Sequence, residues 1–128
     1  MTIVTTVGRD PARVDVDVTP GEPVDLTVPV LDAAGAVQSL VGWVLSATVR
    51  RDANSPVLHV FATAVVAASG TPGTAGYDPG GVQITASGAA TALWAQWLVP
   101  SARWTLWLTP PASEPYLHAA GWVRLTTH

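Results

Sequence analysis

Short segments in which apolar and polar residues alternate follow one another along this chain, separated by turns rich in glycine and proline. Residues 24–31 form one such segment and end at a turn over residues 32–35, and residues 41–50 and 81–85 form two more. Because side chains of a β-strand point alternately to opposite faces, this period of two predicts half-buried strands. The chain is therefore predicted to be mostly β.

Composition limits the chain to one domain with few chemical options. Its 128 residues are enough to bury a core without staples, and the absence of cysteine excludes disulfides and thiolate metal sites. Hydrophobic residues make up 48% and charged residues 12%. The surface must therefore consist largely of small polar residues, or be covered in part by partner proteins.

The charges predict neither a nucleic-acid partner nor a membrane partner. Six basic residues, all of them arginine, stand against nine acidic residues and are spread along the sequence, giving a net charge of −3 and no basic stripe. Residues 1–7 lack the basic start and long apolar run of a secretion signal, and no segment approaches the length needed to cross a bilayer. We expect synthesis in the cytoplasm.

The individual segments suggest where each strand lies. Residues 14–18 would place three valines on one face and two aspartates on the other, and Pro29 predicts an edge or a bulge in the strand over residues 24–31. Residues 57–67 are apolar on both sides, as expected of a central strand covered twice or of a strand at an interface. The loop over residues 69–81, rich in glycine and proline, is either mobile or shaped by a partner.

The last third of the chain predicts one helix and a terminal hairpin. Ser87 is a plausible N-cap for a helix near residues 88–98, and alternating strands follow over residues 103–109 and 117–126. About seven strands with one short helix favour an all-β fold, an immunoglobulin-like antiparallel β-sandwich. We expect an N-terminal arm over residues 1–13 and a single sandwich domain over residues 14–128.

No set of side chains is equipped for catalysis, so the chain is predicted not to be an enzyme and to need no cofactor. Asp15 and Asp17 lie on the solvated face of a strand without a third oxygen ligand nearby, and the three histidines are scattered without zinc-site spacing. The chain has neither a Gly-x-Ser-x-Gly elbow nor a lysine to hold a phosphate. We therefore predict no metal site.

Two regions are candidates for a protein interface. Alternation places Trp107 and Trp122 on the outer face of the terminal hairpin, with Arg124 beside Trp122 and able to stack on an indole. Aromatic and arginine residues dominate binding hot spots, although two such indoles can also stabilise an exposed sheet by pairing with each other. The second region lies in the arm, where the β-prone residues Ile3, Val4 and Val7 are suited to adding a strand to a neighbouring subunit.

The order of segments resembles that of the small β-sandwich domains of tailed-phage structural proteins. The resemblance rests on GEPVDLTVPVLDAAG, LVGWVLSATVR, GGVQITAS before a short helix, ARWTLWL and a closing GWVRL, over roughly residues 14–126. The family includes the N-terminal domain of baseplate upper proteins and tail-fibre attachment modules. The resemblance implies a non-enzymatic assembly role in the virion, in contact with other virion proteins and with further copies of itself in three-fold or six-fold symmetry.

The sequence is compatible with three functions. The first is a tail, baseplate or tail-tip subunit that acts as a fibre adaptor, and the second is a capsid decoration or head-fibre protein with the same fold. The third is a carbohydrate-binding module in which Trp107 and Trp122 form a stacking platform, although few polar side chains surround them to read hydroxyl groups.

Overall fold

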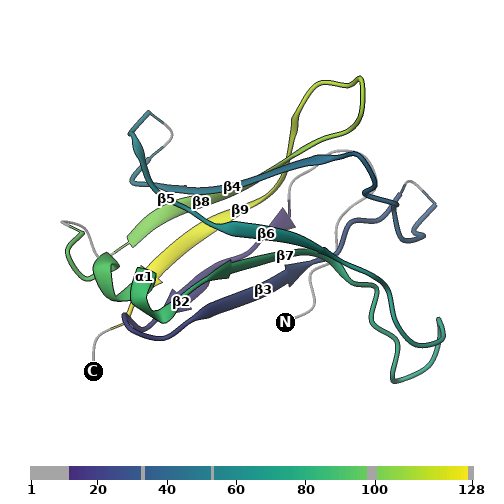
Figure 1. Ribbon diagram of the computed structural model, residues 1–128, viewed down its shortest axis with the longest axis horizontal. Coiled ribbons are helices and arrows are strands. Elements are labelled where there is room, and N and C mark those ends of the chain that lie inside the picture. The colour runs from purple at the N-terminus through teal and green to yellow at the C-terminus, as the bar shows by residue number, and fades with distance from the viewer. Residues whose placement is uncertain (1–11, 33, 53, 98–100, 127–128) are drawn as a thin grey trace.

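The chain folds into two stacked β-sheets with one helix at the end of the stack (Figure 1). The computed structural model describes residues 12–32, 34–52, 54–97 and 101–126. The larger sheet has the order β1-β9-β8-β4-β5, with β2 also paired to β9, and the smaller sheet has the order β3-β7-β6. The elements are β1 (Ala12–Arg13), β2 (Val16–Val18), β3 (Val24–Val28), β4 (Val44–Arg50), β5 (Val57–Val60), β6 (Ala62–Val66), β7 (Gly81–Ala86), α1 (Gly88–Trp94), β8 (Ser101–Thr109) and β9 (Tyr116–Leu125).

The strand order confirms the predicted immunoglobulin-like β-sandwich. If β3 to β9 are taken as strands B, C, C′, D, E, F and G, one sheet reads B-E-D and the other reads G-F-C-C′, as in immunoglobulin domains. One edge of the larger sheet is parallel, whereas the sequence predicted an antiparallel fold. Both β1 and β2 run parallel to β9, whereas the other strand pairs that the structure describes are antiparallel.

The predicted strand over residues 57–67 is divided between the two sheets. Phe61 donates its backbone N–H to the carbonyl of Ala47 on β4 at 2.9 Å, and β6 then pairs with β7 in the smaller sheet. As a result, β5 and β6 each form the edge of a sheet. The expectation of a central strand covered on both sides is wrong, because the chain leaves one sheet for the other at the buried Phe61. The alternative, a strand at an interface, remains a prediction.

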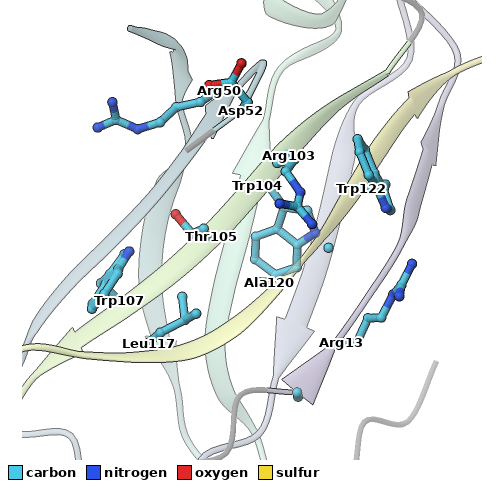
Figure 2. A pocket seen from close by; sticks show the side chains of 12 residues that line it. Arg13, Arg50, Asp52, Arg103, Trp104, Thr105, Trp107, Leu117, Ala120 and Trp122 are labelled. Carbon is cyan, nitrogen blue, oxygen red and sulfur yellow. The ribbon is translucent and has the colours of Figure 1, made fainter. Parts of the chain in front are cut away.

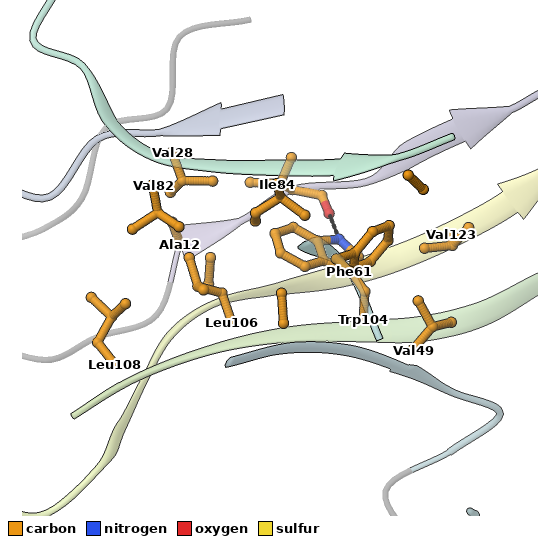
Figure 3. Close-up of a cluster of buried hydrophobic side chains, with 14 of the residues drawn as sticks. Ala12, Val28, Val49, Phe61, Val82, Ile84, Trp104, Leu106, Leu108 and Val123 are labelled. Atoms are coloured by element: carbon orange, nitrogen blue, oxygen red, sulfur yellow. Dashed lines mark hydrogen bonds between the residues drawn. The ribbon is translucent and has the colours of Figure 1, made fainter. Parts of the chain in front are cut away.

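The strands β1 and β2 form one edge strand that is interrupted at Val14 and Asp15. Its register with β9 is the same on both sides of the interruption, and Val14 donates its N–H to the carbonyl of Ala120 at 2.9 Å. The buried carbonyl of Val14 accepts a hydrogen bond of 2.7 Å from the indole Nε1–H of Trp104, which lies in the core (Figure 3). Residues 12–13, which were expected in the arm, are therefore part of the larger sheet.

A β-bulge in β9 connects the two sheets through a histidine. Trp107 pairs with Leu117 while the residue before Trp107 pairs with Ala119, so His118 is the extra residue and is buried together with Ala119. The Nε2 atom of His118 lies 2.9 Å from the carbonyl oxygen of Pro29, just after β3. Burial lowers the pKa of His118, which the hydrogen bond partly opposes, so the neutral ring donates this bond across the sandwich.

The core lies between the sheets and takes side chains from both (Figure 3). Full burial of a Val, Leu or Ile side chain in such a core contributes roughly 1.5–3 kcal/mol to the free energy of unfolding. The largest fully buried side chains are Trp104, Ile84, Leu106, Leu108, Val14, Val28, Val49, Val82, Val123 and Thr91.

The single helix described begins as predicted and ends earlier. The Ser87 hydroxyl accepts a hydrogen bond of 3.1 Å from the Ala90 N–H, which makes Ser87 the N-cap of α1. The helix ends at Trp94 rather than near residue 98, and Leu98 lies outside the described residues. Trp94 is buried and stacks on Trp97 with ring centroids 4.9 Å apart. Leu93, one residue before Trp94, is exposed.

At Gly121 the backbone of the edge strand lies close against β9. A Cβ at Gly121 would overlap the carbonyl oxygen of Val14, whereas a Cβ at Gly76 would meet no atom. We predict that Gly121→Ala lowers the free energy of unfolding by about 2 kcal/mol or more, measured by urea denaturation, because the backbone has to move. The matched control, Gly76→Ala, should change it little. Equal midpoints for the two variants would contradict this explanation of Gly121.

Candidate functional site

The outer face of the larger sheet carries Trp107 and Trp122, the two tryptophans that were predicted to point outward. On β8, Ala102, Trp104, Leu106 and Leu108 are buried, so the residues between them point away from the core. On β9, Val123 is buried between Trp122 and Arg124. Trp107 and Trp122 therefore lie on the same outer face, and Figure 2 shows them on either side of Thr105.

The two indoles are separated rather than paired. Trp107 lies opposite Leu117, while Trp122 lies opposite Arg103, four residues further along β8. At about 3.3 Å per residue this corresponds to about 13 Å along the sheet. The alternative in which the indoles stabilise the sheet by contacting each other directly is therefore wrong. Trp107 is 41% exposed, and Trp122 is half-buried.

Trp122 is covered by a different arginine from the one expected. The guanidinium carbon of Arg103 lies 4.9 Å from the centroid of the Trp122 ring, within the range of a cation–π interaction. Arg124, which the sequence suggested as the stacking partner, instead approaches Asp15 with 3.8 Å between Nη2 and Oδ2. The register explains the difference, because Arg103 lies directly across from Trp122 on the neighbouring strand.

Asp15 connects the edge strand to Trp122. Its Oδ1 accepts a hydrogen bond of 3.0 Å from the backbone N–H of Trp122 and lies 3.6 Å from Nε of Arg13. The pKa of Asp15 is lowered, first by this backbone hydrogen bond and then by the charges of Arg13 and Arg124. Asp15 thus has a structural role that its expected position on a solvated face did not suggest.

Arginines that are far apart in the sequence meet on this face. Arg13 from β1, Arg50 from β4 and Arg103 from β8 line a shallow depression of about 440 Å³ together with Trp107 and Trp122 (Figure 2). Asp52 lies at the same depression, and Arg124 is on the same face of β9. Four of the six basic residues of the chain therefore lie on one sheet face. This grouping could not be predicted from the sequence, because it depends on strand register and on the parallel edge strand.

Two of these arginines, Arg50 and Arg103, could pair with a carboxylate of a binding partner. Arg50 donates from Nη1 to the carbonyl of Ser55 at 2.8 Å, and Arg103 lies over Trp122. Within the residues that the structure describes, neither forms an ion pair. Guanidinium groups beside exposed aromatic rings are suited to binding carboxylates and to stacking against planar groups.

The outer face of the smaller sheet is acidic by comparison. Asp25 on β3 is exposed and accepts a hydrogen bond of 3.1 Å from Nε2 of Gln83 on β7. The sequences of β3, β6 and β7 contain no arginine or lysine. The two outer faces of the sandwich therefore differ in their arginine content. The face with Trp107 and Trp122, where four arginines stand against Asp15, Asp17 and Asp52, is the one suited to an acidic partner.

The remaining candidates do not form a second site. Ile3, Val4 and Val7 lie outside the described residues. His59 is half-buried against Phe61 and Trp94, and burial lowers its pKa; in the described part of the chain its Nε2 has no hydrogen-bond partner.

Two further findings concern metals and membranes. Among residues 12–32, 34–52, 54–97 and 101–126, no three His, Cys, Asp or Glu side chains gather closely enough to hold a metal ion. No helix in those ranges is long and apolar enough to span a bilayer.

Comparison with known proteins adds no relative. The chain matches no family model, no curated protein and no solved structure.

The lowered pKa of Asp15 predicts a pH-dependent contribution to stability. A carboxyl group with a folded-state pKa below its ordinary value of 3.8 stabilises the fold above that pH, and the contribution is lost as the pH falls through the folded-state pKa. We therefore expect Asp15→Asn to have a lower urea midpoint than the wild type at pH 7, and the difference to shrink at pH 3.

Asp17→Asn is the matched control for this prediction. Asp17 is exposed on β2, and no hydrogen bond or ion pair of its carboxylate occurs within the described residues. Its variant should have a midpoint close to that of the wild type at both pH values. A difference between wild type and Asp15→Asn that is unchanged from pH 7 to pH 3 would contradict the role assigned to the Asp15 carboxylate.

Proposed function

We propose that this chain is a non-enzymatic structural subunit of a tailed-phage virion, located in the tail at the baseplate or tail tip, where it acts as a fibre adaptor. The observation that carries the proposal is the gathering of two indoles and four arginines on the outer face of the larger sheet. On this proposal that face binds a neighbouring virion protein.

The chemistry of the face supports protein binding. Tryptophan and arginine are the residues most enriched in binding hot spots, and Trp107 exposes 41% of its surface beside the depression. Arg50 and Arg103 add positive charge at the same place. A partner segment with a carboxylate next to an apolar or aromatic side chain would satisfy both features, and its carboxylate would pair with a guanidinium group while Trp107 becomes buried.

The phage assignment is supported by the resemblance of the segment order and by the β-sandwich fold that it implied. A sandwich holds a sheet face rigidly, so side chains on that face are already positioned before the partner binds. The same argument applies to a capsid decoration or head-fibre protein, which only the position in the particle distinguishes from a tail subunit.

Binding of carbohydrate receives less support from the geometry. A stacking platform requires open aromatic faces, but Arg103 covers one face of Trp122. The two rings are also offset by four residues along β8, with Thr105 between them.

Removal of both indoles tests the proposal. We predict that Trp107→Ala combined with Trp122→Ala leaves the chain folded, by circular dichroism, and lowers its amount in purified particles at least about tenfold, measured by quantitative mass spectrometry. Hot-spot residues typically contribute about 2 kcal/mol or more each, which exceeds the free energy of a tenfold change. The matched control, Leu93→Ala, removes an exposed apolar side chain of α1 and should be incorporated normally.

The position of the chain within the virion can be tested on the same purified particles. Immunogold labelling of wild-type virions should mark the tail end. Label over the head would replace the tail assignment with the decoration protein, and normal incorporation of the double variant would overturn the proposed interface. Absence of label from all particles would overturn the virion role, and a tryptophan fluorescence change on addition of cell-wall polysaccharide would then support the carbohydrate alternative.

A further inference from the structure

The sandwich has four sheet edges, and three of them carry features that hinder pairing with another strand. Strand β3 is flanked by Pro23 and Pro29. The edge strand formed by β1 and β2 is interrupted and bears charged side chains, and β5 has only four residues and follows Pro56. Prolines, charges, interruptions and short length are the devices by which proteins protect sheet edges.

The fourth edge, β6, carries no proline, no charged side chain and no interruption. Strand β6 pairs with β7 on one side only, so the backbone groups on its other side are available to a further strand. Ala62 and Ala64 are exposed, and Val65 is 55% exposed. No Asp, Glu, Lys or Arg occurs between Asp52 and Asp78.

The apolar character of this edge comes from the residues of β6 itself. Thr63, Val65 and Val66 are β-branched, and β6 begins directly after Phe61, where the chain crosses between the sheets. An edge of this kind, β-branched and uncharged, is the type that pairs with another chain.

We propose that β6 pairs antiparallel with β6 of a second copy of this chain, so that the two smaller sheets form one continuous sheet across a twofold axis. The absence of charge along the edge favours a second copy as the occupant. Each chain has a net charge of −3, and β6 is an edge at which two copies can meet without placing like charges opposite each other. Pairing of identical strands also matches their lengths automatically.

The register of this pairing follows from the length of the strand. Full antiparallel pairing of Ala62–Val66 with itself places Ala64 on the twofold axis and sets Val65 opposite Thr63 of the second copy. Each Val65 would then be covered by a neighbouring strand, in place of the solvent that it now contacts. This edge is separate from the outer face of the larger sheet, so pairing and partner binding are compatible.

Two variants and their controls test the pairing in solution, independently of the virion role. The wild-type chain, residues 1–128, should sediment as a dimer at sufficient concentration. Val65→Lys should raise the dissociation constant of that dimer at least about tenfold, because it places charge in the strand interface. Val41→Lys is the matched control, since Val41 is 86% exposed in a turn outside the edge. Circular dichroism should show both variants folded.

The absence of native cysteine permits a direct measurement of the register. Ala64→Cys should form an interchain disulfide under mild oxidation much faster than Val41→Cys, because only residue 64 meets its own copy on the axis. A wild-type chain that stays monomeric, or equal cross-linking of the two cysteine variants, would overturn the proposal. Loss of association on deletion of residues 2–7 would also overturn it and would identify the arm as the pairing strand. None of these outcomes depends on incorporation into particles.

Discussion

The hydrogen bond from the indole of Trp104 to the carbonyl of Val14 determines how the larger sheet is completed. Val14 is buried at the interruption of the edge strand, and leaving a buried carbonyl without a donor costs about 1–3 kcal/mol. Trp104 supplies that donor from β8, across β9, and Gly121 allows the two backbones to approach. The strand over residues 12–18 is thereby held in parallel register with β9.

The surface proposed to bind a partner depends on this buried contact. The fixed register places Asp15 where it accepts the N–H of Trp122, and it brings Arg13 to the depression that Trp107 also lines. Arg103 reaches the Trp122 ring from the other side, along β8. A core hydrogen bond thus positions charged and aromatic groups on the opposite, outer side of the same sheet, where they are held in place before any partner arrives.

The local sequence pattern was sufficient to predict the fold class, the Ser87 cap and the outward direction of Trp107 and Trp122, because each depends on residues close in sequence. It failed where distant segments decide the outcome. The apolar run over residues 57–67 has the pattern of a covered strand, but it crosses between sheets at Phe61 and forms two edges. The choice of Arg103 as the partner of Trp122 and the gathering of arginines follow from register between strands, which a single sequence does not display.

Native-state hydrogen exchange of a Trp104→Phe variant tests whether the Trp104 indole holds the edge strand against β9. Phenylalanine keeps most of the apolar ring and removes the N–H that Val14 requires. We expect exchange to accelerate more at the amides of Val14 and Trp122, which bond to Ala120 and Asp15, than at the amides of the β3 and β7 pair. Equal acceleration at all of these positions would show only a general loss of stability and would contradict the claim that Trp104 holds the edge strand.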